Sequence, residues 1–279
     1  MSSTDSDHFA SRASAHPGTR TRVGIGGWTF APWRDNFYPA TLVQRRELEY
    51  ASRHVTAIEV NGTYYGAQKP ATYVKWREQT PDGFMFSLKA PRYTTDRTTL
   101  ADAGKSIDAF VNGGITELGD RLGPINWQFP LHKPFEHDDF TAFLELLPRT
   151  LDGRALRHVV EVRNESFACA KYLDLARQHG IATVFTDSPK YPSFADVTGD
   201  FVYLRLMRSQ ASIASGYAVA ALDEWATRVR LWANGSEPDD VPRLVPPLAG
   251  ENPRDVFVYF ISAAKERNPA AAMGLLARL

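Results

Sequence analysis

Charged and amide side chains recur at a spacing of two in short β-rich runs of the sequence. Alternate residues of a strand point to the same side. Glu59 therefore shares a face with Asn61, and Glu161 shares a face with Arg163. Other polar side chains stand on the same face, or at the ends, of further runs: Lys89, Gln128, Asp187 and Arg205. Carboxylates and cations that are buried together must pair, hydrogen-bond or hold a ligand.

This polar set has the composition of an acid–base site. Paired carboxylates can act as acid and base when their surroundings separate their pKa values, and the candidates for this role are Glu59, Glu161 and Asp187. The side chains expected to bind and orient a substrate are Trp28, Asn61, Tyr65, Lys89, Gln128, Arg163, Arg205 and Tyr259. The alternative is an ion network that satisfies itself and only fills the interior.

A second feature follows the last β-rich run. Ser262 and Lys265 precede Asn268–Pro269, which predicts the N-cap and the first residue of a helix. A helix N-terminus attracts anions, so Ser262 and Lys265 are candidates for anion binding, with an ordinary capped helix as the alternative. No predicted strand ends in histidine, so we predict no transition-metal site and no cofactor. A hard divalent cation held by carboxylate oxygens stays open.

Short strands and helices alternate along the chain, and these elements must position the polar set. The predicted strands are Val23–Trp28, Ala57–Asn61, Met85–Lys89, Ile125–Phe129, His158–Arg163, Thr183–Asp187, Phe201–Met207 and Val256–Ile261. The predicted helices are Thr41–Arg53, Pro70–Gln79, Ala103–Leu118, Asp138–Leu147, Cys169–His179, Ala221–Asn234 and Pro269–Leu279. Eight such units predict a closed (β/α)8 TIM-type barrel with parallel strands and an outer ring of helices, whose site lies where the strands end.

Some segments do not fit the alternation. The link between Asp187 and Phe201 contains two prolines and leaves little room for a helix, and the segment 236–254 is predicted to be a long loop. Gly24, Gly26 and Gly27 suggest a dinucleotide fold, but Thr29 stands where the third glycine of that fingerprint belongs. We therefore predict a flexible tail over residues 1–20 and one barrel domain over residues 21–279.

The overall charge is balanced. Lys plus Arg and Asp plus Glu each number 32 in the 279 residues, which argues against binding nucleic acid or a membrane through bulk charge. A local basic patch stays open. The single cysteine, Cys169, cannot form an internal disulfide, and the first twenty residues lack the apolar stretch of a secretory signal. The expected location is the cytoplasm.

Several short motifs occur in a characteristic order. They are G-I-G-G-W (24–28), E-V-N-G-T-Y-Y (59–65), K-A-P (89–91), W-Q-F-P (127–130), E-V-R (161–163), D-S-P (187–189), Y-L-R-L (203–206), S-G-Y (215–217) and V-Y-F (258–260). On these motifs the chain resembles the YecE-like family, domain of unknown function 72. The resemblance implies a barrel similar in outline to sugar isomerases and abasic-site endonucleases, without an established activity.

The chain departs from the family pattern at three places. Asn164, Met207–Arg208 and Ile261–Ser262 stand where the family commonly has His, His-Gly and a pair of asparagines. The departures put a shared histidine-dependent mechanism in doubt. The leading hypothesis is an enzyme of hydrolase, lyase or isomerase type that acts on a small polar, anionic substrate at the barrel mouth. The alternatives are a nucleic-acid-processing protein similar to abasic-site endonucleases and a non-catalytic ligand-binding or sensor protein.

Overall fold

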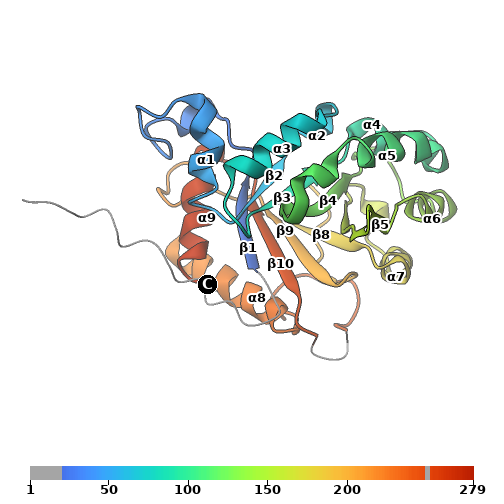
Figure 1. The fold of residues 1–279 in the computed structure, drawn as a ribbon. Coiled ribbons are helices and arrows are strands. Elements are labelled where there is room, and N and C mark those ends of the chain that lie inside the picture. Colours follow the sequence, from blue (N-terminus) through green and yellow to red (C-terminus); the bar gives the residue numbers. More distant parts are fainter. Residues whose placement is uncertain (1–20, 249–251) are drawn as a thin grey trace, which may run out of the picture.

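Eight parallel strands close into a barrel in this computed structural model, which describes residues 21–248 and 252–279 (Figure 1). The strands are β1 (Thr21–Gly26), β2 (Ala57–Val60), β3 (Met85–Lys89), β4 (Leu122–Gln128), β7 (His158–Glu161), β8 (Ala182–Asp187), β9 (Phe201–Leu206) and β10 (Asp255–Phe260). Their order around the barrel is β1-β10-β9-β8-β7-β4-β3-β2, so each strand pairs with its neighbours in sequence. The predicted (β/α)8 architecture is confirmed, and the predicted tail over residues 1–20 lies outside the described residues.

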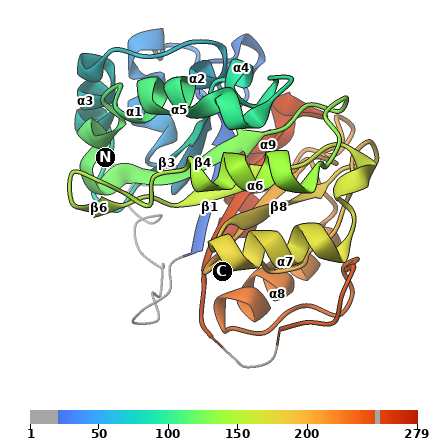
Figure 2. The same ribbon diagram turned by 90° about the vertical axis from the view of Figure 1, so that its right-hand side faces the viewer.

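Helices cover the outside of the barrel. They are α1 (Glu47–Ala51), α2 (Gly62–Tyr65), α3 (Pro70–Gln79), α4 (Arg92–Thr95), α5 (Gly104–Val111), α6 (His137–Glu145), α7 (Ala170–His179), α8 (Val219–Ala233) and α9 (Asn268–Leu276). Figure 2 shows α6 and α7 lying next to each other outside the strands. A small antiparallel hairpin, β5 (Thr150–Leu151) with β6 (Arg154–Ala155), precedes β7.

Two helices are shorter than the sequence pattern predicts. The stretch 41–53 holds only a 3-10 turn (Gln44–Arg46) and α1. The stretch 103–118 breaks after α5, because Gly114 has a φ of 99°, in the left-handed region that ends a helix. A 3-10 segment, Ile115–Arg121, follows. Between β8 and β9 the described chain forms no helix, as its prolines predict.

The two faces of the strands pack into separate clusters. The outward residues form a large apolar layer with the helices, as alternation predicts; examples are Ile58, Val60, Val160, Val162 and Leu204. A smaller cluster fills the barrel from inside and includes Phe201, Tyr203, Phe257 and Tyr259. The rings of Tyr203 and Tyr259 lie 5.0 Å apart, centroid to centroid. Burying a large apolar side chain contributes about 1.5–3 kcal/mol, so the aromatic interior supports the polar groups that lie above it.

Gly24 serves the packing of β1 against β2. A Cβ at this position would stand 2.0 Å from the backbone oxygen of Ala57, closer than any side chain can approach. Gly24 is therefore required for strand packing, which agrees with the rejection of a dinucleotide-binding loop.

The long predicted loop after α8 is present. Residues 236–248 and 252–254 contain neither helix nor strand, and residues 249–251 lie outside the described part. The carboxylate of Asp196 accepts the backbone N–H groups of Leu244 and Val245 at 2.9 and 3.1 Å and so anchors the loop. None of the helices in residues 21–248 and 252–279 combines the length and apolar character that crossing a bilayer requires.

Candidate active site

Arg205 stands between two carboxylates inside the barrel. Its Nη2 donates to Oε1 of Glu59 at 3.0 Å, and its Nη1 donates to Oε2 of Glu161 at 2.6 Å. The three side chains come from β9, β2 and β7 and are essentially buried, with side-chain exposures of 3%, 0% and 0%. A buried charge is tolerated only when it is paired in this way.

The cluster extends toward the carboxyl ends of the strands through Arg163. Its Nε donates to Oε1 of Glu161 at 2.9 Å, and its Nη2 donates to Oε1 of Gln128 at 2.9 Å. Lys89 Nζ donates to the same Gln128 oxygen at 2.7 Å. We call the connected set the barrel network; it consists of Glu59, Lys89, Asn126, Gln128, Glu161, Arg163 and Arg205.

Contacts of Tyr203 and Asn126 complete the inner part of the network. Tyr203 donates its hydroxyl to Oε2 of Glu59 at 2.7 Å. Asn126 Nδ2 makes long contacts with both carboxylates, 3.5 Å to Glu59 and 3.4 Å to Glu161. Within the described chain, Asn126 Oδ1 and Arg205 Nε are buried without a hydrogen-bond partner. The deep end of the network thus has one acceptor and one donor left over, which is uncommon for buried polar atoms.

The charges of the network shift its pKa values in opposite directions. Burial alone would raise the pKa of Glu161, but the attraction of Arg205, Arg163 and Lys89 outweighs it and lowers that pKa to about 2. Burial, aided by repulsion from Arg205, lowers the pKa of Lys89 to about 8. Burial also raises the pKa of Tyr203, and the neighbouring Glu59 adds to this. Glu161 is therefore a fixed anion at neutral pH, whereas Lys89 exchanges its proton close to that pH.

The placement of Asp187 in the interior set is wrong. In the β8–β9 register Thr186 stands beside Arg205, whereas Asp187 stands beside Leu206, whose side chain belongs to the outer layer. The Asp187 carboxylate instead pairs with Arg208 Nε at 2.6 Å. Burial raises the pKa of Asp187, and Arg208 opposes this rise.

Two predicted substrate-binding residues, Trp28 and Tyr259, lie away from the mouth. Trp28 packs edge-on against Trp76, with ring centroids 5.1 Å apart, in the outer layer, because β1 ends at Gly26 and the chain turns outward. Tyr65 is 76% exposed on α2, with its ring centroid 5.3 Å from that of Tyr64, and its contact with a substrate stays a prediction. Tyr259 is buried among the interior rings, where its hydroxyl lies 2.6 Å from Ser87 Oγ. By contrast, Asn61 is half-buried beside Gly26, at the carboxyl ends of the strands.

The predicted anion site after β10 has a different geometry from the expected one. The N-cap of α9 is Arg267, and Asn268 is already helical, so the predicted cap is wrong by one residue. The Asn268 side chain joins two loops, because Nδ2 donates to the Ser262 carbonyl at 3.2 Å and Oδ1 accepts from Ser209 Oγ at 2.8 Å. Ser262 is exposed with a φ of 59°, and Lys265 Nζ lies 4.4 Å from the ring centroid of Phe30. Anion binding there stays a prediction.

Sequence reasoning missed some members of the site. Asn126 stands two residues before Gln128 on β4, so the spacing rule that identified Gln128 could also have identified Asn126. Tyr64 receives a hydrogen bond from Gln128 Nε2 at 3.1 Å, and the ring of Tyr191 lies 4.3 Å from the Arg163 guanidinium carbon. Tyr64 stands on the four-residue helix α2 and Tyr191 in a loop, and neither segment is long enough for a periodic pattern to predict orientation.

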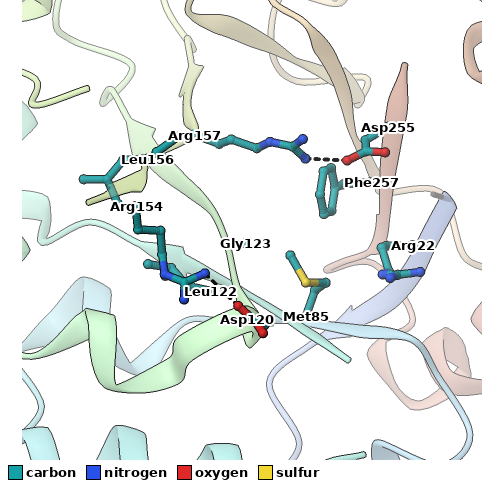
Figure 3. A pocket seen from close by; sticks show the side chains of 11 residues that line it. Arg22, Met85, Asp120, Leu122, Gly123, Arg154, Leu156, Arg157, Asp255 and Phe257 are labelled. Carbon is teal, nitrogen blue, oxygen red and sulfur yellow. Dashed lines mark hydrogen bonds and ion pairs between the residues drawn. The ribbon is translucent and has the colours of Figure 1, made fainter. Parts of the chain in front are cut away.

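A cavity of about 580 Å³ lies at the opposite, amino-terminal end of the barrel (Figure 3). Arg157 pairs with Asp255 at 2.5 Å and Arg154 with Asp120 at 3.0 Å along its wall. These pairs neutralise Arg157 and Arg154, and Arg22 lines the same cavity. Within residues 21–248 and 252–279, no group of three or more His, Cys, Asp or Glu side chains is arranged to hold a metal ion.

The closed parallel barrel, with a charged network at the carboxyl ends of its strands, defines a TIM-type (β/α)8 protein. The chain belongs to the family described as "Protein of unknown function DUF72", whose sequence profile matches residues 22–279. It is 28% identical over 146 residues to the UPF0759 protein YecE of Escherichia coli strain K12, a match that covers 52% of this chain and 49% of YecE. The match thus spans about half the length of this curated relative.

Solved structures share the fold. A DUF72 family protein from Thermotoga maritima superposes with a TM-score of 0.71 at 20% identity, covering 92% of this chain and 98% of that one. A DUF72 family protein from Enterococcus faecalis gives 0.68 at 15% identity, with 93% and 95% covered. The protein SacUVDE gives 0.52 at 10% identity, with 93% and 97% covered. These likenesses support the barrel and say nothing of its chemistry.

Proposed function

We propose that the chain is an enzyme that binds a small polar anion at the carboxyl-terminal mouth of its barrel and moves a proton on it. One observation carries the proposal: two cationic groups, Lys89 Nζ and Arg163 Nη2, converge on one neutral oxygen, Gln128 Oε1, at 2.7 and 2.9 Å. A carboxylate or phosphate oxygen placed there would make stronger, charge-assisted hydrogen bonds with both groups than the amide does.

The charge balance of the network supports the same position for the ligand. Its three cations face two carboxylates, and Arg205 is already held by both of these carboxylates. Glu161 also pairs with Arg163 at 2.7 Å, so two carboxylates are shared among three cations and the excess positive charge lies at the Lys89 and Arg163 end of the network. The Arg163 side chain is also the more exposed end of the network, at 20% against 3% for Arg205. An anion arriving from solvent would meet these two cations first.

The pKa shifts favour Lys89 as the proton carrier. Because the pKa of Glu161 is held at about 2, this carboxylate holds the two arginines in place and is a poor acid or base at neutral pH. Lys89, with a pKa lowered to about 8, can both accept and give a proton under those conditions. The proposed division of roles is proton transfer by Lys89, anion binding by Arg163, and orientation by Glu161 and Glu59.

Ligand-observed NMR with a panel of small carboxylates and phosphate esters tests anion binding. Arg163→Gln should weaken binding about tenfold or more, because a charge-assisted hydrogen bond contributes roughly 1.5–3 kcal/mol. Arg154→Gln is the matched control, since Arg154 pairs with Asp120 at the other end of the barrel. Equal binding by both variants would show that the anion does not bind at the mouth.

A second measurement separates an enzyme from a binding protein. Bound ligands would be incubated in D2O, where proton transfer exchanges carbon-bound hydrogen for deuterium. Exchange or turnover that stops in Lys89→Arg supports the enzyme. Binding without exchange supports a sensor. Salt-dependent binding of an abasic duplex, with no small-anion binding, would support nucleic-acid processing instead.

A further inference from the structure

Lys133 shows how this protein stabilises a buried lysine as an ammonium ion. Its Nζ donates to Asp139 Oδ2 at 3.1 Å and to the carbonyls of Arg97 and Thr98 at 3.1 and 2.7 Å. All three donors of the ammonium group thus have an acceptor, and one acceptor is a carboxylate. Lys133 is 8% exposed, so burial alone does not distinguish it from Lys89 at 6%.

Lys89 has different surroundings. Its Nζ donates to the neutral oxygen of Gln128 at 2.7 Å and lies 4.1 Å from the ring centroid of Tyr64. Among residues 21–248 and 252–279, no carboxylate oxygen lies within ion-pair distance, 4.0 Å, of this nitrogen. The Lys89 site therefore supports an ammonium less well than the Lys133 site.

A second cation adds to this effect. Arg163 Nη2 reaches the same Gln128 oxygen at 2.9 Å, so a guanidinium stands beside the Lys89 amine. Burial and a neighbouring cation are the two arrangements that keep a lysine amine neutral and nucleophilic. The pKa of Lys89, lowered to about 8 mainly by burial, agrees with this geometry. A useful fraction of free amine is then present near neutral pH.

We propose that Lys89 is a nucleophile that forms an imine with a small 2-oxo acid, whose carboxylate is held by Arg163. The proposal rests on the proposed anion site at the mouth. Lys89 Nζ and Arg163 Nη2 donate to the same oxygen, Gln128 Oε1, and therefore lie close together. A ligand that reaches both must carry its carbonyl carbon next to its anionic group. In a 2-oxo acid the two groups are adjacent, which matches that spacing.

The step balances without an oxidant or reductant. The Lys89 nitrogen forms a bond to the carbonyl carbon, the C=O electron pair moves to oxygen, and the oxygen takes a proton while the nitrogen loses one. The oxygen then takes a second proton, the C–O bond breaks and water leaves, and the nitrogen loses its second proton, so amine and carbonyl become imine and water. The Tyr64 hydroxyl accepts from Gln128 Nε2 at 3.1 Å and keeps its own proton to donate. Burial raises the pKa of Tyr64, which keeps the phenol protonated.

Borohydride trapping tests this step on the full chain. The protein would be mixed with pyruvate at a pH of about 8 and reduced with sodium borohydride, which converts an imine into a stable secondary amine. Peptide mass mapping then finds the adduct. We expect saturable labelling at Lys89, about tenfold above that of Lys133 and of the exposed Lys69. Labelling of Lys89 no greater than that of Lys69 overturns the proposal, and this comparison needs no variant.

Variants of the protein and analogues of pyruvate show which residue and which ligand group produce the trapped adduct. Lys89→Arg keeps the charge but cannot form an imine, so the adduct should disappear while circular dichroism shows a folded chain. Arg163→Gln should lower labelling by pyruvate about tenfold more than labelling by acetone, because acetone loses only the effect of the neighbouring cation on the Lys89 amine, whereas pyruvate also loses the partner of its carboxylate. Lactate has the carboxylate of pyruvate but a hydroxyl in place of the ketone. If lactate binds but pyruvate does not label Lys89, the imine is refuted and the anion site stands. If Lys89 is trapped equally by pyruvate and acetone, the nucleophile stands and the proposed role of Arg163 fails.

Discussion

Glu161→Gln tests whether the barrel network stabilises the fold as an ionised unit. The carboxylate is fully buried and accepts from Arg205 at 2.6 Å and from Arg163 at 2.9 Å. A glutamine has the same shape, but its amide nitrogen is a donor and cannot accept from an arginine. One arginine therefore loses this acceptor in the variant; Arg163 keeps no carboxylate beside it, whereas Arg205 keeps Glu59 at 3.0 Å.

The pKa of Glu161 gives the magnitude. A folded-state pKa of about 2 against an ordinary 4.5 corresponds to about 3 kcal/mol of stability at neutral pH. Removal of one partner from a buried ion pair costs about 3–5 kcal/mol by mutagenesis, which agrees. For a chain of this size the loss should lower Tm by roughly 10 °C.

The dependence on pH provides a second check. Because the folded pKa lies below the unfolded one, the stabilisation is complete above about pH 4.5 and is lost as the pH falls toward about 2. The difference in Tm between wild type and Glu161→Gln, measured by differential scanning fluorimetry, should be constant from neutral pH to about 5 and narrow below that.

An exposed neighbour is the control for this comparison. Glu165→Gln changes a solvent-exposed carboxylate on the following loop and should alter stability by less than about 0.5 kcal/mol. If Glu161→Gln were as stable as Glu165→Gln at neutral pH, the network would not act as a stabilising ionic unit and the charge argument for the site would fail.

Three further outcomes follow from the same geometry. Tyr203→Phe removes the hydroxyl that donates to Glu59 at 2.7 Å and leaves a buried carboxylate oxygen short of a donor, so urea denaturation should show a loss of about 1–3 kcal/mol; an unchanged midpoint would contradict the contact. Gly24→Ala would place a Cβ 2.0 Å from a carbonyl of β2, so folded protein should be lost, whereas Gly62→Ala, with open space around its Cβ, should stay soluble; equal yields would argue against the strand packing. Reductive methylation with ¹³C-formaldehyde should give one lysine NMR signal that titrates near pH 8 and is absent from Lys89→Arg, and a titration of that signal near pH 10 would refute the shifted pKa.

The inward polar set could be predicted in large part from the sequence. Alternation along one strand is a local property, so Glu59 could be assigned to the face opposite Ile58 and Val60 without knowledge of the partners. The same reasoning placed Arg205 inside, opposite Leu204. The alternation of elements also predicted the barrel, since parallel strands need crossovers and eight such units close.

The face of Asp187 could not be predicted with the same reliability. Its position at a strand end suggested the mouth, but the register with β9 places Thr186, and not Asp187, beside Arg205. The prediction for Trp28 was wrong for a related reason. Strand β1 ends at Gly26, so the alternation of side chains along this strand no longer applies two residues later. Where a strand stops is decided by its neighbours' hydrogen bonds, which the local pattern does not contain.

The sequence by itself determined the barrel and most of the side chains that face inward, because both follow from periodicity along the chain. Only the tertiary structure decided which of those charges meet. Closure of the barrel brings Glu59 and Arg205, 146 residues apart, to 3.0 Å, and it leaves Lys89 beside a second cation with a neutral amide as its acceptor. Pairing, burial and the resulting pKa values depend on distances between strands, and these are fixed only when the sheet closes.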